Sequence, residues 1–174
     1  MIRGLVRGAL VASGVGWVVD RLMRSVATGP PPAIESLIVI DAPIERVWSV
    51  VADVVGQPRW MTDMKSVRIL TPGRVGVGTR AEATIRMFGL SVTDPVTVTE
   101  FRPPTRFAVR HEGTVIGTGV ITLESGADGS TTIVRWEERL TPPALPYLGA
   151  AVMAPPFRKV FQTDLERLRD LVEA

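Results

Sequence analysis

The sequence predicts an α+β fold in which a curved antiparallel sheet of about seven strands wraps around a long C-terminal helix. Between residues 79 and 140, apolar and polar side chains alternate through a series of short segments, as in strands with one buried face. From residue 157 to 172, apolar residues recur at three- and four-residue steps, as on the buried side of a helix. A chain of 174 residues is long enough to bury one such core unaided.

The clearest boundary in the chain is a run of three prolines that follows Gly29. Consecutive prolines cannot continue a helix and favour an extended chain, so we divide the sequence into a helical segment over 1–32 and a globular domain over 33–174. The first segment holds four arginines against one aspartate, a net charge of +3, whereas the domain holds 16 basic and 17 acidic side chains. Binding to nucleic acid of any sequence requires a basic surface, so we expect no nucleic-acid partner.

The composition also limits the chemistry of the protein. There is no cysteine and His111 is the single histidine, which excludes disulfides, thiolate nucleophiles and sites built from several cysteines or histidines. A glycine-rich stretch over 73–78 precedes a strand rather than a helix, so it lacks the helix N-terminus that binds phosphate. We therefore expect neither a metal nor a cofactor.

The domain opens with an apolar, β-branched segment over 34–40, which predicts a strand. Pro43 suits the first position of a helix, and apolar residues over 44–55 share one helical face. Pro58 ends this helix, and residues 59–64 are expected to form a second short helix.

Antiparallel strands account for the middle of the domain. Five segments show the alternation or the Val/Thr content of strands, namely 79–87, 95–101, 106–112, 115–123 and 133–140. Ala127-Asp128-Gly129, between the last two, favours a hairpin turn. Five prolines between 141 and 156 indicate a kinked, mobile approach to the C-terminal helix.

The apolar strand faces and the C-terminal helix supply candidates for the wall of an internal cavity. Gly117 and Gly119 would leave volume on one strand, and Phe157 and Phe161 would close the space from the helix. The alternative is that these side chains simply fill the core. The expected lining is Ile85, Met87, Phe107, Val109, His111, Gly117, Gly119, Ile121, Trp136, Glu138, Phe157 and Phe161.

Two ionisable residues fall on otherwise apolar strand faces. His111 and Glu138 would be costly to bury without a partner, so one interpretation is a polar pair inside the cavity that orients a carbonyl or hydroxyl of a ligand. The same pair is the candidate acid and base for a cyclisation or dehydration. In the alternative, each lies solvated at a strand end or makes a structural hydrogen bond.

The segment over 2–27 predicts an amphipathic helix, because its five charged residues share one arc of a helical wheel. The apolar side and Trp17 predict a surface that binds a membrane or a partner helix, formed by Leu5, Val11, Val15, Trp17, Val18, Val19 and Leu22. A row of small residues (Gly4, Gly8, Ala12 and Gly16) would let another helix approach closely.

Four interpretations of this helix remain open. It can lie in the membrane interface, span the membrane as a short anchor, pack on its own domain or a partner subunit, or act as a cleaved signal peptide. The charge-free stretch over 8–19 is short for a span, which favours the interface. We expect membrane association, most simply at the cytoplasmic face of a bacterial plasma membrane.

Several short motifs, in this order, resemble those of the START-like (SRPBCC, helix-grip) superfamily, in its polyketide cyclase/dehydrase and lipid-transport branch. The matching stretches lie at 42–48, 75–80, 98–104 and 134–138, with Trp60 between the first two. The resemblance covers 34–173 and implies a helix-grip fold with a deep apolar cavity. It implies no shared catalytic residues.

The resulting hypothesis is a protein that binds, and transfers at a membrane surface, a lipid or another hydrophobic small molecule. Burial of apolar ligand surface is sufficient for such binding, and no enzymatic step is required. The alternatives are a polyketide or terpenoid cyclase or dehydrase that uses His111 and Glu138, and an accessory subunit whose N-terminal helix packs into a membrane complex.

Overall fold

The computed structural model describes residues 2–27, 29, 33–87, 89–142 and 145–174; the side chains of 2–13, Met87 and Leu90 lie outside that description. The helices are α1 (Ile2–Val26), α2 (Ile44–Val51), the 3₁₀ helix η1 (Val54–Arg59) and α3 (Pro146–Glu173). The strands are β1 (Ile34–Ile40), β2 (Met64–Ile69), β3 (Arg80–Met87), β4 (Leu90–Arg102), β5 (Arg106–Glu112), β6 (Ile116–Ser125) and β7 (Thr132–Thr141).

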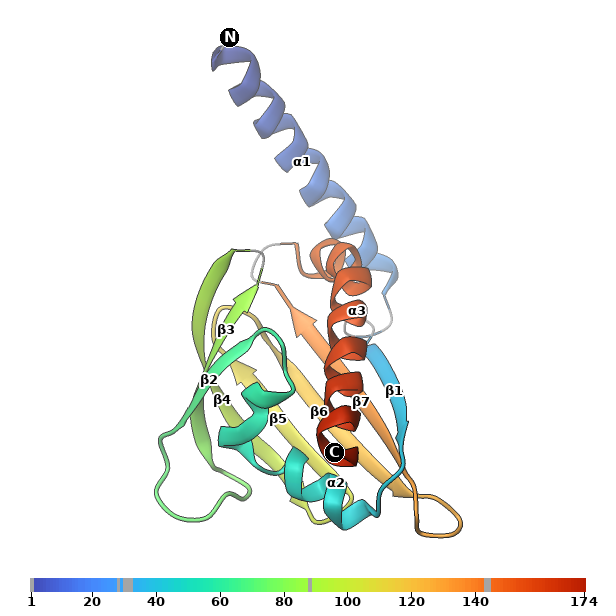
Figure 1. Ribbon diagram of the computed structural model, residues 1–174. Coiled ribbons are helices and arrows are strands. Elements are labelled where there is room, and N and C mark those ends of the chain that lie inside the picture. The colour runs from blue at the N-terminus through green and yellow to red at the C-terminus, as the bar shows by residue number, and fades with distance from the viewer. Residues whose placement is uncertain (1, 28, 30–32, 88, 143–144) are drawn as a thin grey trace.

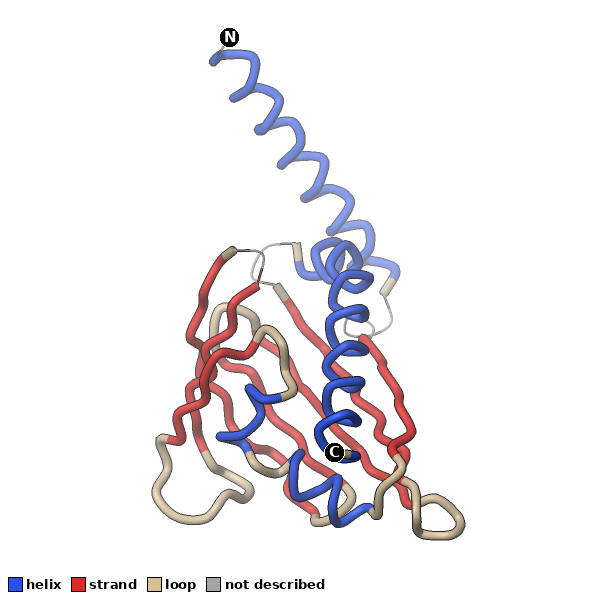
Figure 2. Tube along the Cα trace, viewed as in Figure 1, coloured by secondary structure: helices blue, strands red, loops and turns tan. Residues whose placement is uncertain are grey.

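The seven strands form one antiparallel sheet in the order β1-β7-β6-β5-β4-β3-β2. The curved sheet wraps around α3, and the shorter helices α2 and η1 lie on the same side of it (Figures 1 and 2). The hairpin between β6 and β7 turns at Gly129, which has a positive φ of 74°. This is the helix-grip arrangement, and the predicted α+β fold is confirmed.

The core lies between the sheet and the buried face of α3. Phe161, Leu165, Leu168 and Val172 are buried at three- and four-residue steps along that helix, as the sequence predicts. A chain of aromatic contacts joins the helices to the sheet: the rings of Trp60 and Trp136 meet edge to face at 5.9 Å. The Trp136 ring lies 4.6 Å from that of Phe161.

The segment between β1 and β3 differs from the sequence prediction. Pro43 is the N-cap of α2 rather than its first residue, and the second short helix is η1, which ends at Arg59, the first residue of the predicted 59–64 range. Met64 instead begins β2, an edge strand with a register shift between Met64 and Ser66. The half-exposed pattern of an edge strand with an irregularity gives no regular alternation, so the sequence does not mark it.

The approach to the C-terminal helix also differs. Helix α3 already begins at Pro146, and Pro155 and Pro156 lie inside it. Proline is tolerated in the first turn, where the backbone N–H has no partner in the helix, so Pro146 does not delay the start of α3. The two other prolines of this segment are Pro142, which follows β7, and Pro143, which lies outside the described residues.

The C-terminal half of α1 packs on the start of α3, and the rest of α1 projects away from the sheet (Figure 1). The less exposed residues of this half recur at 16, 19, 20 and 23, which is one helical face. A methyl group at Gly16 would lie 3.3 Å from Leu145 Cδ1, so Gly16 makes a close approach to the protein's own domain, whereas the other three members of the predicted row, Gly4, Gly8 and Ala12, fall among the residues whose side chains are not described. In the part of the chain with a described structure, no helix is long and apolar enough to cross a membrane.

Candidate ligand-binding cavity

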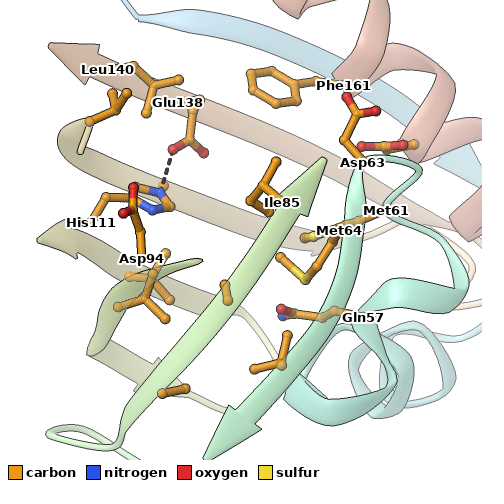
Figure 3. A pocket seen from close by; sticks show the side chains of 18 of the residues that line it. Gln57, Met61, Asp63, Met64, Ile85, Asp94, His111, Glu138, Leu140 and Phe161 are labelled. Atoms are coloured by element: carbon orange, nitrogen blue, oxygen red, sulfur yellow. Dashed lines mark ion pairs between the residues drawn. The ribbon is translucent and has the colours of Figure 1, made fainter. Parts of the chain in front are cut away.

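A cavity of about 370 Å³ lies between the concave face of the sheet and α3 (Figure 3). Its wall is mostly apolar, with side chains from β2 to β7, η1 and α3. The volume lies in the range of sites for small organic molecules, near its lower end. The cavity therefore suits a compact apolar ligand rather than a molecule with several long chains.

The structure places ten of the twelve predicted lining residues along this cavity: Ile85, Phe107, Val109, His111, Gly119, Ile121, Trp136, Glu138, Phe157 and Phe161. Their faces follow from strand alternation, which directs every second side chain of a strand to the same side. The side chain of Met87 lies outside the described residues. Contact of these residues with a ligand stays a prediction.

Gly117 was expected to add volume to the cavity, and this expectation is wrong. A methyl group at Gly117 would lie 2.0 Å from the backbone oxygen of Arg139, so this glycine permits close approach of β6 to β7. At Gly119 a methyl group would lie 2.5 Å from Glu138 Oε2. The space beside Gly119 is thus occupied by the Glu138 carboxylate.

His111 and Glu138 approach each other across a strand that carries glycine between them. His111 on β5 pairs with Gly117 on β6, and Glu138 on β7 pairs with Gly119. Neither position of β6 bears a side chain, so the imidazole and the carboxylate meet over the backbone of that strand. His111 Nε2 lies 2.7 Å from Glu138 Oε1. The predicted polar pair is therefore formed.

The Glu138 carboxylate is held in a nearly closed environment. The residue is 4% exposed, and its Oε2 accepts a hydrogen bond of 2.9 Å from Trp136 Nε1. Its Oε1 and His111 Nε2 are buried and close, but their angles do not satisfy a hydrogen bond. The contact between the two residues is thus mainly electrostatic, and one carboxylate oxygen has unused capacity to accept a hydrogen bond.

Burial opposes protonation of His111, but the neighbouring carboxylates outweigh it. The Glu138 carboxylate, through close contact and charge, and the more distant Asp94 raise the pKa of His111 above its ordinary value. The folded protein therefore holds a proton on this imidazole more readily than the unfolded chain does. Asp94 is itself fixed by hydrogen bonds from the backbone N–H and the hydroxyl of Thr114, at 2.9 and 3.1 Å.

A second polar group lies across the cavity from His111, where η1 leads into β2 and faces α3. Asp63 and Asp164 both line the cavity there. Oδ1 of the buried Asp164 accepts hydrogen bonds from Thr62, at 2.7 Å from the backbone N–H and 2.6 Å from the hydroxyl. Burial raises the pKa of Asp164, although the bonds from Thr62 act in the opposite direction.

Sequence reasoning missed several residues of the wall. Asp164 stands beside Leu165 on the buried side of the helix, and a charged residue there is a signal that could have been used. Asp94 lies within the 13 residues of β4, of which only 95–101 were expected to be a strand. Val54 comes from η1, whose position was not predicted.

Within the described part of the chain, no cluster of three or more acidic or histidine residues could hold a metal ion. The site offers an apolar wall, carboxylate oxygens that accept hydrogen bonds, and one imidazole. Such a wall can bind an apolar molecule and orient its polar end. The His111–Glu138 pair can also hold and move a proton.

Solved structures share this architecture. The protein TTHA0849 from Thermus thermophilus matches at a TM-score of 0.65 and 20% identity, over 81% of this chain and 97% of that one. A START superfamily protein from Mycobacterium smegmatis matches at 0.64 and 15%, over 82% and 97%. The di-domain ARO/CYC protein BexL of the BE-7585A biosynthetic pathway matches at 0.66 and 20%, over 81% of this chain and 46% of its own.

At these identities the solved structures show the fold alone. No curated protein matches the chain. The model of one protein family, described as polyketide cyclase/dehydrase and lipid transport, matches residues 31–173. That match covers the whole sheet and α3, with the cavity between them, and the chain therefore belongs to this polyketide cyclase/dehydrase and lipid-transport family.

Proposed function

We propose that the protein binds a small hydrophobic molecule in its cavity without altering it, and exchanges that molecule at a membrane surface. The observation that carries the proposal is the mostly apolar cavity of about 370 Å³ between the sheet and α3. Burial of ten methylene groups would contribute about 8 kcal/mol before ordering costs, so affinity needs no covalent step. The family description includes lipid transport, which supports the same function.

The surface of α1 supports a role at the membrane. Val15, Val18 and Leu22 are 58%, 59% and 61% exposed and lie on one side of the helix, away from the face that packs on α3. Exposed Arg21 lies beside this apolar stripe, and the segment over 1–32 has a net charge of +3. An exposed apolar stripe next to basic side chains suits an interfacial helix on anionic lipid.

Helix α3 provides a physical link between this surface and the cavity. Its first turn contacts α1 through Tyr147 and Leu148, and farther along it Met153 and Phe157 line the cavity. Docking of α1 on a membrane would thus hold one wall of the cavity close to the lipid surface. We place the protein at the cytoplasmic face of a bacterial plasma membrane.

Native mass spectrometry of gently purified full-length protein tests the binding function. We expect a defined apolar adduct at a one-to-one ratio, which organic extraction would recover unchanged. Incubation with candidate ligands, followed by extraction, should return each ligand intact. A protein that stays empty and takes up no apolar ligand would contradict the proposal.

Sedimentation with vesicles of anionic or uncharged phospholipid tests the membrane function. We expect the full chain to bind the anionic vesicles, and a variant with Val15, Val18 and Leu22 changed to serine to lose most of that binding. A matched control changes Val55, Val77 and Ile116, which are exposed on the domain, to serine. Equal loss in both variants, or stable co-purification with a membrane complex and no vesicle binding, would contradict it.

The second candidate function is a cyclase or dehydrase acting on a polyketide or terpenoid. The observation that favours it is the contact of His111 with Glu138 at the cavity wall, where the two side chains can serve as an acid and a base. A catalyst changes its ligand, so recovery of a cyclised or dehydrated product would support this function. The product should then disappear in the variant Glu138→Gln, while ligand uptake persists.

A further inference from the structure

The charge of the cavity wall narrows the class of ligand. We propose that the cavity takes apolar molecules whose polar end is neutral or cationic and donates hydrogen bonds, and that it excludes carboxylate and phosphate lipids. This inference rests on the proposed binding function and specifies its ligand. It is carried by the ionisable residues of the wall and by their partners.

The acidic residues outnumber the basic ones in the wall. Four carboxylates line the cavity, those of Asp63, Asp94, Glu138 and Asp164. The imidazole of His111 is the one group among the described lining residues that can carry a positive charge, since neither lysine nor arginine is found there. With His111 protonated, the carboxylates still exceed the positive charge.

Behind the wall, the described residues place no lysine or arginine in a salt bridge with these carboxylates, although the charge of Arg167 acts on Asp164 from a distance. Asp94 accepts its hydrogen bonds from Thr114, and Asp164 accepts its own from Thr62. The exposed Arg167 donates to the Thr62 hydroxyl, at 3.2 Å, rather than to the Asp164 carboxylate.

The wall also presents a buried carboxylate oxygen, Glu138 Oε1, whose near neighbour His111 Nε2, at 2.7 Å, is not aligned for a hydrogen bond with it. Glu138 is 4% exposed, lines the cavity, and keeps Oε1 without a hydrogen bond although Oε2 is satisfied by Trp136. A buried acceptor of this kind is costly unless a donor reaches it. A hydroxyl or ammonium group of a ligand would supply that donor, whereas a carboxylate would bring a second acceptor.

The polar groups lie on two sides of an apolar centre. Figure 3 shows His111, Asp94 and Glu138 together on one side and Asp63 on the other, with Ile85 and Met64 between them. An apolar body can occupy the centre while its polar end meets carboxylate oxygens on either side. At neither side would an anionic head group find a lysine or arginine among the described lining residues.

Electrostatic interactions explain why the cavity would prefer cationic over anionic head groups. Like charges repel more strongly inside a water-poor cavity than in solvent, because the effective dielectric constant is lower. An anionic head would lose hydration and meet carboxylates, whereas an ammonium head would replace hydration by attraction. Anionic phospholipid is thus suited to hold α1 at the surface of a membrane, and unsuited to enter the cavity.

The test compares three ligands with the same ten-carbon chain and different ends: decanol, decylamine and decanoate. Each would displace the uncharged dye N-phenyl-1-naphthylamine from the full-length protein at pH 7.5. We expect decanol and decylamine to bind at least about tenfold more tightly than decanoate, which is the effect of about 1.4 kcal/mol. In the double variant Asp94→Asn, Glu138→Gln, the ratio of the dissociation constant of decanoate to that of decylamine should fall about tenfold. The surface variant Asp170→Asn, 69% exposed at its side chain, should leave that difference unchanged.

The outcomes separate this inference from the function on which it rests. Decanoate binding as tightly as decylamine, or an unchanged preference in the double variant, would overturn the charge selectivity and leave hydrophobic binding intact. Failure of the dye and of all three ligands to bind would overturn the binding function itself.

Discussion

The Asp20 carboxylate of α1 caps the first turn of α3, where its Oδ1 accepts hydrogen bonds from the backbone N–H groups of Tyr147 and Leu148 at 2.8 and 2.9 Å. Leu145, the N-cap residue of α3, makes no side-chain hydrogen bond of its own. Asp20 therefore satisfies N–H groups that have no partner within the helix, and its charge suits the positive end of the helix dipole. This explains why a charged residue of an exposed helix is only 1% exposed.

Removal of this cap should release α1 from the domain. In the variant Asp20→Ala, two N–H groups lose their acceptor, and we expect a loss of about 1 kcal/mol in the contact between α1 and α3. Trypsin should then cleave at Arg24 faster than in the natural protein, while the thermal transition of the domain changes little. The control is Arg21→Ala, which changes an exposed residue one position away. Equal cleavage rates in the two variants would contradict the capping role.

The ion pair in the cavity predicts a pH dependence of stability. The Glu138 and Asp94 carboxylates raise the pKa of His111 in the folded state, so the fold binds a proton more readily than the unfolded chain. This stabilisation is complete below the unfolded pKa of about 6.5, and is lost as pH rises through the folded pKa. Urea unfolding between pH 6 and pH 9 should show a decline that is absent in His111→Gln.

The same measurements test whether the pair matters to the fold. At pH 6, His111→Gln should reduce the free energy of unfolding by about 1–3 kcal/mol, because Glu138 loses its buried partner. Exposed Arg139, next to Glu138 on β7 and on the opposite face, supplies the control Arg139→Gln. A decline with pH that is the same in the natural protein and in His111→Gln would rule out this linkage.

The His111–Glu138 pair shows which features of the site can be predicted from the sequence. Alternation along β5 and β7 correctly assigns His111 and Glu138 to the inner face, because the side-chain period of a strand is fixed. Their contact depends on the register of both strands against β6, which is set by pairing across the sheet. That register also places Gly119 beside the Glu138 carboxylate. From the sequence alone, we could predict that a glycine leaves free volume, but not which group occupies it.

For the N-terminal helix α1, the pattern of polar and apolar residues did not predict the face that packs on the domain. Its helical wheel places Asp20 with the arginines on a polar arc and Val19 on an apolar one, yet both lie on the face that packs on the domain. A wheel records polarity, and it does not record a hydrogen-bond acceptor for a helix more than a hundred residues away. The edge strand β2 was missed for a related reason, since its partners and its bulge are not local.

The close fit of Gly119 against Glu138 predicts that position 119 of β6 tolerates no side chain. In Gly119→Ala the new methyl group would lie 2.5 Å from Oε2, and the carboxylate would have to leave its place beside Trp136. We expect a loss of about 1–3 kcal/mol in the free energy of unfolding, measured by urea denaturation. Gly76→Ala is the matched control, because nothing lies within 4 Å of the added methyl group. Similar stability of both variants would show that the carboxylate is free to move.

Asp164, on the second polar side of the cavity, predicts another pH dependence of the free energy of unfolding. It begins at lower pH than the one that comes from His111. Burial raises the pKa of Asp164 in the folded state, so the unfolded chain releases this proton more readily. As pH rises from the ordinary aspartate value through the folded pKa, this group makes the folded state less stable. Asparagine keeps the oxygen that accepts both bonds from Thr62 and removes the charge.

Asp164→Asn should therefore be at least as stable as the natural protein at pH 7, and should lack the part of the pH dependence that comes from this carboxyl. Asp164→Ala should lose about 1–3 kcal/mol, because the N–H and hydroxyl of Thr62 lose their acceptor. Urea unfolding of the three proteins between pH 4 and pH 8 measures both effects. If Asn and Ala at this position destabilise the fold equally at pH 7, the negative charge itself is required. Asp164 would then stabilise the fold as an ion, against the direction that its burial predicts.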